Sequence, residues 1–165
     1  MRKLPPLVVG SQTWTLPFSD RSAAALVEEL LRSPTNAGAA RSADCLTLDP
    51  PLMLWAASRA WSLDGLQPRS LKRLVDWLRN RAARALLWPE PAEKAYHTPS
   101  SDEQRQKSSA QVAHDLTVAE LAAAQAAQDG EELAEEARLL GLLSGAQLWL
   151  ETAWPGVGAD NTLPP

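Results

Sequence analysis

At 165 residues the chain is long enough to bury a sizeable core. Its 45% hydrophobic and 22% charged residues are typical of a globular protein and exclude an intrinsically disordered chain. Its net charge of −4 argues against a general affinity for nucleic acids or anionic membranes. The single cysteine, Cys45, excludes an internal disulfide and is expected to be a buried, inert thiol. Because no apolar run reaches about 18 residues, we predict a cytoplasmic protein without a membrane span.

Leucine and alanine dominate the composition and no segment alternates with a period of two, so we predict an all-α fold of about seven helices with no sheet. Capping residues and prolines set the boundaries, as at Asp49-Pro50, where a cap acceptor precedes proline in the first turn. The helices are predicted to run from Ser19 or Asp20 to Ser33, from Thr35 or Asn36 to Leu46, from Pro50 to Asp64, from Pro68 to Leu78, from Asn80 to Trp88, over 104–128 and over 131–150.

The helices are expected to form two lobes, over residues 19–88 and 104–150. Residues 1–18, broken by three prolines, are predicted to be an extended lead-in. Residues 89–103 are predicted to be a linker or long loop, which leaves His97 exposed and without ligand-type neighbours at metal spacing. The tail over 151–165, rich in glycine and proline, is expected to be irregular and to lead to a further module.

The most informative motif lies between His114 and Leu150. Its first part is His114-Asp115-Leu116-Thr117-Val118-Ala119, and its second part is Glu135-Glu136-Ala137-Arg138-Leu139-Leu140-Gly141-Leu142-Leu143-Ser144-Gly145. Together they resemble the HD superfamily of metal-dependent phosphohydrolases, and most of all its HDOD branch, which occurs in bacterial signalling proteins. In that family a first His opens one helix. A second helix carries Glu-Ala, three residues, Gly-Leu-Leu and then a His-Asp pair that holds the metal.

Ser144 and Gly145 stand where the family has its metal-binding pair. A hydroxyl is a poor ligand for a hard divalent ion and glycine offers no side chain. His114 would be a surviving ligand, but one imidazole cannot hold a metal alone. We therefore interpret His114, Ser144 and Gly145 as vestigial positions and expect no catalytic residue, metal or cofactor. Asp115 is expected to be a solvated surface residue.

A weaker resemblance covers the first half, so that the likeness extends over about residues 15–150. Leu16-Pro17, Leu30-Leu31, Asp49-Pro50-Pro51-Leu52 and Ala57-Ser58-Arg59 follow the family's order, and Leu74-Val75-Asp76-Trp77-Leu78 matches its next helix loosely. Such domains commonly precede sensor, kinase or cyclic-nucleotide modules. The resemblance thus implies a non-catalytic regulatory domain that binds a protein partner or an attached module of this kind.

Two alternatives remain open. A phosphohydrolase with relocated metal ligands would need a second cluster of histidines and carboxylates. The chain has only two histidines, which argues against this alternative. A helical nucleic-acid-binding module, not the function we expect, would use the basic stripe between Arg59 and Arg84, with Trp77 and Trp88 for stacking. The stripe equally fits a solvated face that docks on the acidic residues between Glu120 and Glu136. The candidate interaction surface comprises Arg69, Arg73, Arg79, Arg81, Trp149 and Trp154. The alternative for Trp149 and Trp154 is that they are core residues of the second lobe.

Overall fold

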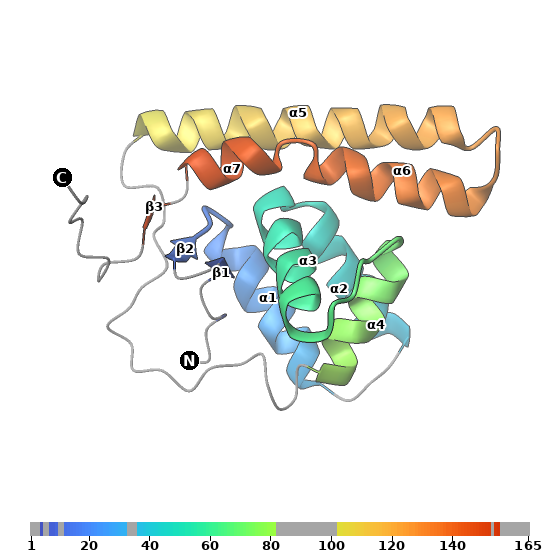
Figure 1. Cartoon of the computed structure of the whole chain (residues 1–165), viewed down its shortest axis with the longest axis horizontal. Helices are drawn as coiled ribbons and strands as arrows, with labels where there is room; N and C mark the ends of the chain where they lie inside the picture. The colour runs from blue at the N-terminus through green and yellow to red at the C-terminus, as the bar shows by residue number, and fades with distance from the viewer. Residues whose placement is uncertain are drawn as a thin grey trace.

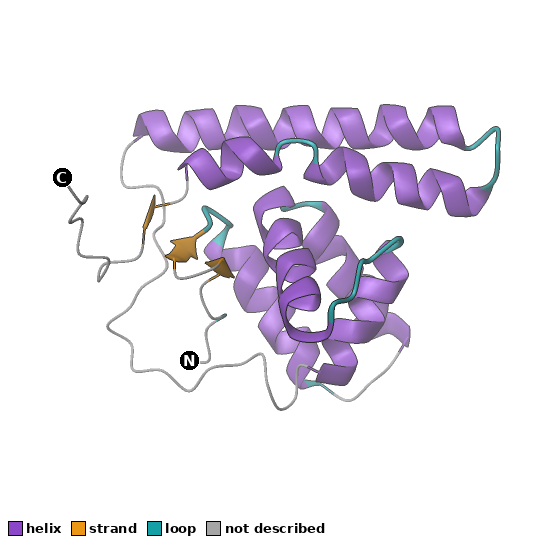
Figure 2. Cartoon of the chain, in the orientation of Figure 1, coloured by secondary structure: helices purple, strands orange, loops and turns teal. Residues whose placement is uncertain are grey.

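The computed structural model describes residues 4, 7–9, 12–32, 36–81, 102–152 and 154–155. Within these residues seven helices make up most of the structure, and three short strands form a small sheet beside them (Figure 2). The predicted helical fold class is confirmed, and the sheet is an addition that the sequence analysis did not foresee. Among the described residues no helix has the length and apolar character needed to cross a bilayer.

Four helices form the N-terminal part: α1 (Asp20–Leu31), α2 (Asn36–Thr47), α3 (Pro50–Asp64) and α4 (Leu71–Arg81). Their boundaries follow local chemistry. The Ser19 hydroxyl accepts the Ser22 N–H at 3.4 Å and caps α1. Gly65 ends α3 with a φ of +63°, and its N–H donates to the carbonyl of Trp61 at 2.8 Å. The third helix thus has both of its predicted ends.

Asp49 caps α3 and also joins it to α1. Its Oδ1 accepts the Leu52 N–H at 3.1 Å, and its Oδ2 accepts the Ser19 N–H at 2.8 Å, across 30 residues of sequence. Burial raises the pKa of the Asp49 carboxyl, although both backbone hydrogen bonds oppose that rise. One carboxylate therefore positions the starts of two helices.

The remaining helices form a long layer across one side of this group (Figure 1). The helix α5 (Asp102–Ala126) and the antiparallel α6 (Glu131–Leu143) make a hairpin, which turns at Gly130 with a φ of +134°. A Cβ at Gly141 would lie 2.5 Å from the Ala119 Cα, so glycine allows the two backbones to approach closely. The helix predicted over 131–150 ends at Leu143, and a separate helix α7 (Ala146–Thr152) follows the Ser144–Gly145 turn.

The core is continuous between the two parts. The central helix α3 contributes Leu52, Met53, Trp55 and Ala56, which are at most 1% exposed. It contacts α2 and α4 in its own part and α5, α6 and α7 in the other. Leu139, Leu142 and Trp149 belong to the same buried cluster as α3. The two predicted lobes thus share one hydrophobic core.

The small sheet joins segments from both ends of the chain. Strands β1 (Leu7–Val9) and β2 (Gln12–Thr15) pair antiparallel, and β3 (Trp154–Pro155) pairs antiparallel with β2. This corrects the extended lead-in and the irregular tail at these residues. The reason is a long-range pairing, Thr15 with Trp154, which no local pattern predicts.

One further boundary needs correction. Asn80, predicted to cap a fifth helix, lies inside α4, and α4 begins at Leu71 rather than at Pro68. The Ser70 hydroxyl accepts the Arg73 N–H at 3.3 Å, so Ser70 supplies the N-terminal acceptor. The rest of the predicted fifth helix, with Arg84 and Trp88, lies outside the described residues, as do His97 and most of the predicted linker.

Candidate functional site

The three vestigial positions have different surroundings. His114 is exposed on α5. Ser144 terminates α6, and both its N–H and its hydroxyl donate to the carbonyl of Gly141, at 3.1 and 2.7 Å. Gly145 is buried in the turn that leads into α7. The serine hydroxyl is therefore occupied in ending a helix.

The residue that the structure brings to this turn is Asp115, which is 0% exposed. Its Oδ2 accepts the indole N–H of Trp149 at 2.8 Å, and its Oδ1 accepts an N–H of the Gln111 amide at 2.8 Å. The expectation of a solvated Asp115 is wrong. Asp115 precedes Ala119 by one helical turn, so it shares the face of α5 that packs against α6.

Gly145 is the residue against which Asp115 packs. A Cβ at this position would lie 2.5 Å from Asp115 Oδ2 and 2.6 Å from Oδ1, where no side chain fits without movement. The first turn of α7 then places Trp149 beside the carboxylate. The backbone N–H of Trp149 donates to the Gly145 carbonyl at 3.1 Å. We call Gln111, Asp115, Gly145 and Trp149 the Asp115 cluster.

The cluster limits the chemistry that is possible beside Gly145. The space that a side chain at Gly145 would occupy is filled by the Asp115 carboxylate, both of whose oxygens accept hydrogen bonds. Within the part of the chain that the structure describes, no three His, Cys, Asp or Glu residues group closely enough to hold a metal ion. Cys45 is partly buried, and that burial raises the pKa of its thiol, which is typical of an unreactive cysteine.

Trp149 does not belong to an exposed interaction surface, contrary to prediction. It is 2% exposed because α7 continues α6 beside α5 and directs the indole to Asp115 (Figure 1). The backbone of Trp154 lies in β3, and its side chain is outside the described part of the chain. The exposed aromatic surface predicted near the C-terminus therefore loses Trp149.

The basic stripe is divided among several partners. Lys72 bonds Asp76 at 2.8 Å on its own helix. Arg81 and the Trp77 indole both donate to Asp64 Oδ2, at 2.9 and 2.6 Å. These hydrogen bonds lower the pKa of Asp64, and the bond from Trp77 has the largest effect. The predicted surface residues Arg69 and Arg73 are exposed, and Arg79 is half-buried. Part of the stripe therefore joins α3 to α4.

The helix that carries part of the stripe lies beside the acidic helix. Helix α4 contacts α6. The pKa of Lys72 is raised, mainly by its bond to Asp76 and to a smaller degree by the charge of Glu135 on α6. The docking of the stripe on the acidic residues stays a prediction.

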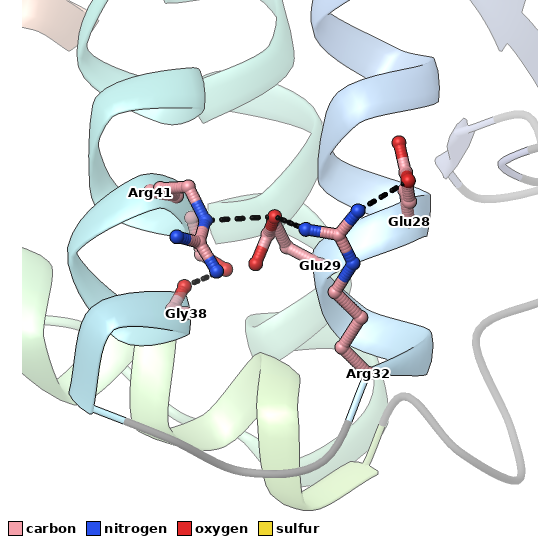
Figure 3. Close-up of polar contacts among 6 residues, drawn as sticks. Glu28, Glu29, Arg32, Gly38 and Arg41 are labelled. Atoms are coloured by element: carbon pink, nitrogen blue, oxygen red, sulfur yellow. Dashed lines mark hydrogen bonds and ion pairs between the residues drawn. The ribbon is translucent and has the colours of Figure 1, made fainter.

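A second ionic cluster, which the sequence analysis missed, joins α1 to α2 (Figure 3). Glu29 is only 7% exposed, and its Oε1 accepts from Arg32 Nη1 and Arg41 Nε, each at 2.8 Å. Arg32 also bonds Glu28 at 2.5 Å. These contacts, the hydrogen bond from Arg41 above all, lower the pKa of Glu29. The spacing from Glu28 and Glu29 to Arg32 is visible in the sequence, whereas the contact with Arg41 requires the fold.

In comparisons with known proteins, no family model, no curated protein and no solved structure matches this chain. The assignment of a function therefore depends on the geometry of the cluster and on the resemblance of the motif.

Proposed function

We propose that this chain is a non-catalytic, HDOD-like regulatory domain of a bacterial signal-transduction protein, which binds a protein partner or an attached module. The observation that carries the proposal is the Asp115 cluster. At the position where the resemblance would have a metal-binding aspartate, Gly145 has no side chain, and the buried Asp115 is committed to Trp149 and Gln111. A carboxylate with both oxygens bonded inside a core stabilises a fold rather than reacting with a substrate.

The arrangement of the helices supports a role in passing on a conformational change. Asp115 holds α7 through Trp149 in the middle of that helix, and β3, which pairs with β2, follows α7. A change in the Ser144–Gly145 turn would therefore reach both the core and the sheet. Such a path would link a binding surface on the helices to an attached module.

The alternative of a metal-dependent phosphohydrolase makes an opposite prediction in a simple assay. The purified chain is incubated with bis(p-nitrophenyl) phosphate in the presence of Mn²⁺, with a chelator-treated sample as the control. We expect no metal-dependent release of nitrophenol. A metal-dependent rate that the substitution His114→Ala abolishes would overturn the proposal, because it would show a working site at the vestigial position.

A further inference from the structure

The side of the α5–α6 hairpin that faces away from the core carries exposed leucines. Leu121 on α5 is 66% exposed, and Leu133 and Leu140 on α6 are 50% and 63% exposed. We call these three residues the leucine face. A single exposed leucine is ordinary on a protein surface, but several on one face of a helical pair indicate a binding surface.

Helix geometry places Leu133 and Leu140 on one side of α6 and Leu121 on the outer side of α5. Leu133 and Leu140 are seven residues apart, which is two turns of α6, while Leu139 and Leu142 turn towards the core. Ala119 meets Gly141 where the two helices approach, so Leu121 and Leu140 lie at nearly the same level of the hairpin. At about 100° per residue, Leu121 projects away from Leu116 and Ala123 on α5, and Leu140 projects away from the buried Leu142 on α6.

The charges around the leucine face indicate what can cover it. Residues 109–149 contain seven carboxylates but only one arginine, Arg138, which pairs with Glu120 at 3.2 Å. Glu132 and Glu136 follow each other by one turn along the edge of the leucine face, and Glu132 is exposed. A second copy of the chain would place two such acidic surfaces against each other, which is unfavourable. A basic partner would be attracted.

We propose that the leucine face binds an amphipathic helix that has an apolar stripe bordered by lysines or arginines. Its apolar residues would cover Leu121, Leu133 and Leu140, and its cations would lie beside Glu132 and Glu136. The inference deepens the proposed function, since it names the partner chemistry of an interaction domain. The inference rests on the proposed function in one respect, which is that the domain acts by binding a partner.

The probe is a fluorescein-labelled synthetic peptide of leucine and lysine with leucines at helical spacing, titrated with the whole chain and followed by fluorescence anisotropy. We expect saturable binding that weakens with added salt. The double substitution Leu133→Gln and Leu140→Gln should weaken it about tenfold or more. Glu132→Gln with Glu136→Gln should weaken it less and should reduce its dependence on salt.

Matched controls separate this surface from general attraction between opposite charges. Leu31 and Leu48 lie outside the hairpin and are 48% and 67% exposed, close to the values of Leu133 and Leu140. Leu31→Gln with Leu48→Gln should leave the affinity within about twofold of the wild type. A peptide with glutamate in place of lysine should not bind. Thermal unfolding of each variant confirms that it is folded.

Three results would overturn the inference. They are the absence of binding to the leucine–lysine peptide, an equal loss of affinity in the Leu31/Leu48 control, and a dimer in sedimentation that the Leu133/Leu140 variant converts to a monomer. The last result would identify a second copy as the occupant. None of them bears on whether the chain hydrolyses phosphodiesters, so a failure here is distinguishable from a failure of the proposed function.

Discussion

Replacing Gly145 by alanine tests the Asp115 cluster directly. The new Cβ would lie 2.5 Å from Asp115 Oδ2, whereas ordinary contacts begin at 3.4 Å. The carboxylate or α7 must therefore move by about 1 Å, which breaks the 2.8 Å bond from the Trp149 indole. Overpacking costs about 1–3 kcal/mol and an unsatisfied buried polar group costs about 1–3 kcal/mol. Because the φ of Gly145 is not positive, the smaller conformational entropy of alanine in the unfolded chain offsets about 0.4–1 kcal/mol.

We therefore expect Gly145→Ala to lower the free energy of unfolding by about 1–5 kcal/mol, as measured by urea denaturation with circular dichroism. A double-mutant cycle with Asp115→Ala tests whether the Asp115 carboxylate causes this loss of stability. Removing the carboxylate gives the new methyl group room, so the double variant should be more stable than the sum of the two single losses predicts, by about 1 kcal/mol or more. Ser144→Ala, at an exposed neighbour, should change stability by about 0.5 kcal/mol. A Gly145→Ala protein as stable as the wild type, or strict additivity in the cycle, would refute the reasoning.

Three further predictions concern the neighbouring features. Gly141→Ala should cost about 2–3 kcal/mol in urea denaturation, because its Cβ would lie 2.5 Å from the Ala119 Cα and the two backbones must separate. The double substitution Ser144→His and Gly145→Asp, which introduces the His-Asp pair of the HD families that the motif resembles, should destabilise the chain more than Gly145→Ala does, since it sets a second carboxylate against Asp115. Added Mn²⁺ should not raise the thermal midpoint of this variant. Because the pKa of Glu29 is lowered in the folded state, its carboxylate stabilises the fold at pH values above the ordinary pKa of 4.5. This stabilisation is lost as the pH falls through the lower pKa of the folded state. Thermal midpoints measured below about pH 4.5 should therefore fall more steeply for the wild type than for Glu29→Gln.

The features that the sequence predicted correctly are those with local causes. Asp49-Pro50 begins α3, Gly65 ends it, and the turn before α6 lies at Gly130, because caps, prolines and glycines act within a few residues. The features it missed depend on contacts between distant segments. Leu139 to Leu150 has a continuous helical pattern, and nothing in it shows that Gly145 would meet Asp115 from another helix and interrupt that pattern.

Asp115 and Trp149 illustrate the same limit for the candidate site. An aspartate beside an exposed histidine is usually solvated, and a tryptophan near the end of a chain can be exposed; each expectation fails here because the two residues bond each other across 34 positions. The pairing of β2 with β3 is of the same kind. That His114, Ser144 and Gly145 are vestigial positions stays a prediction, because it depends on the resemblance.

The most direct test of the central claim is the metal content of the purified chain after incubation with Mn²⁺ or Fe²⁺ and removal of free ions. With Ser144 and Gly145 in place of the pair and Asp115 committed to Trp149, we predict no retained metal above the level of a chelator-treated sample. Retention of about one or two ions per chain, lost in His114→Ala, would contradict the account, because it would show that a working metal site exists around α5.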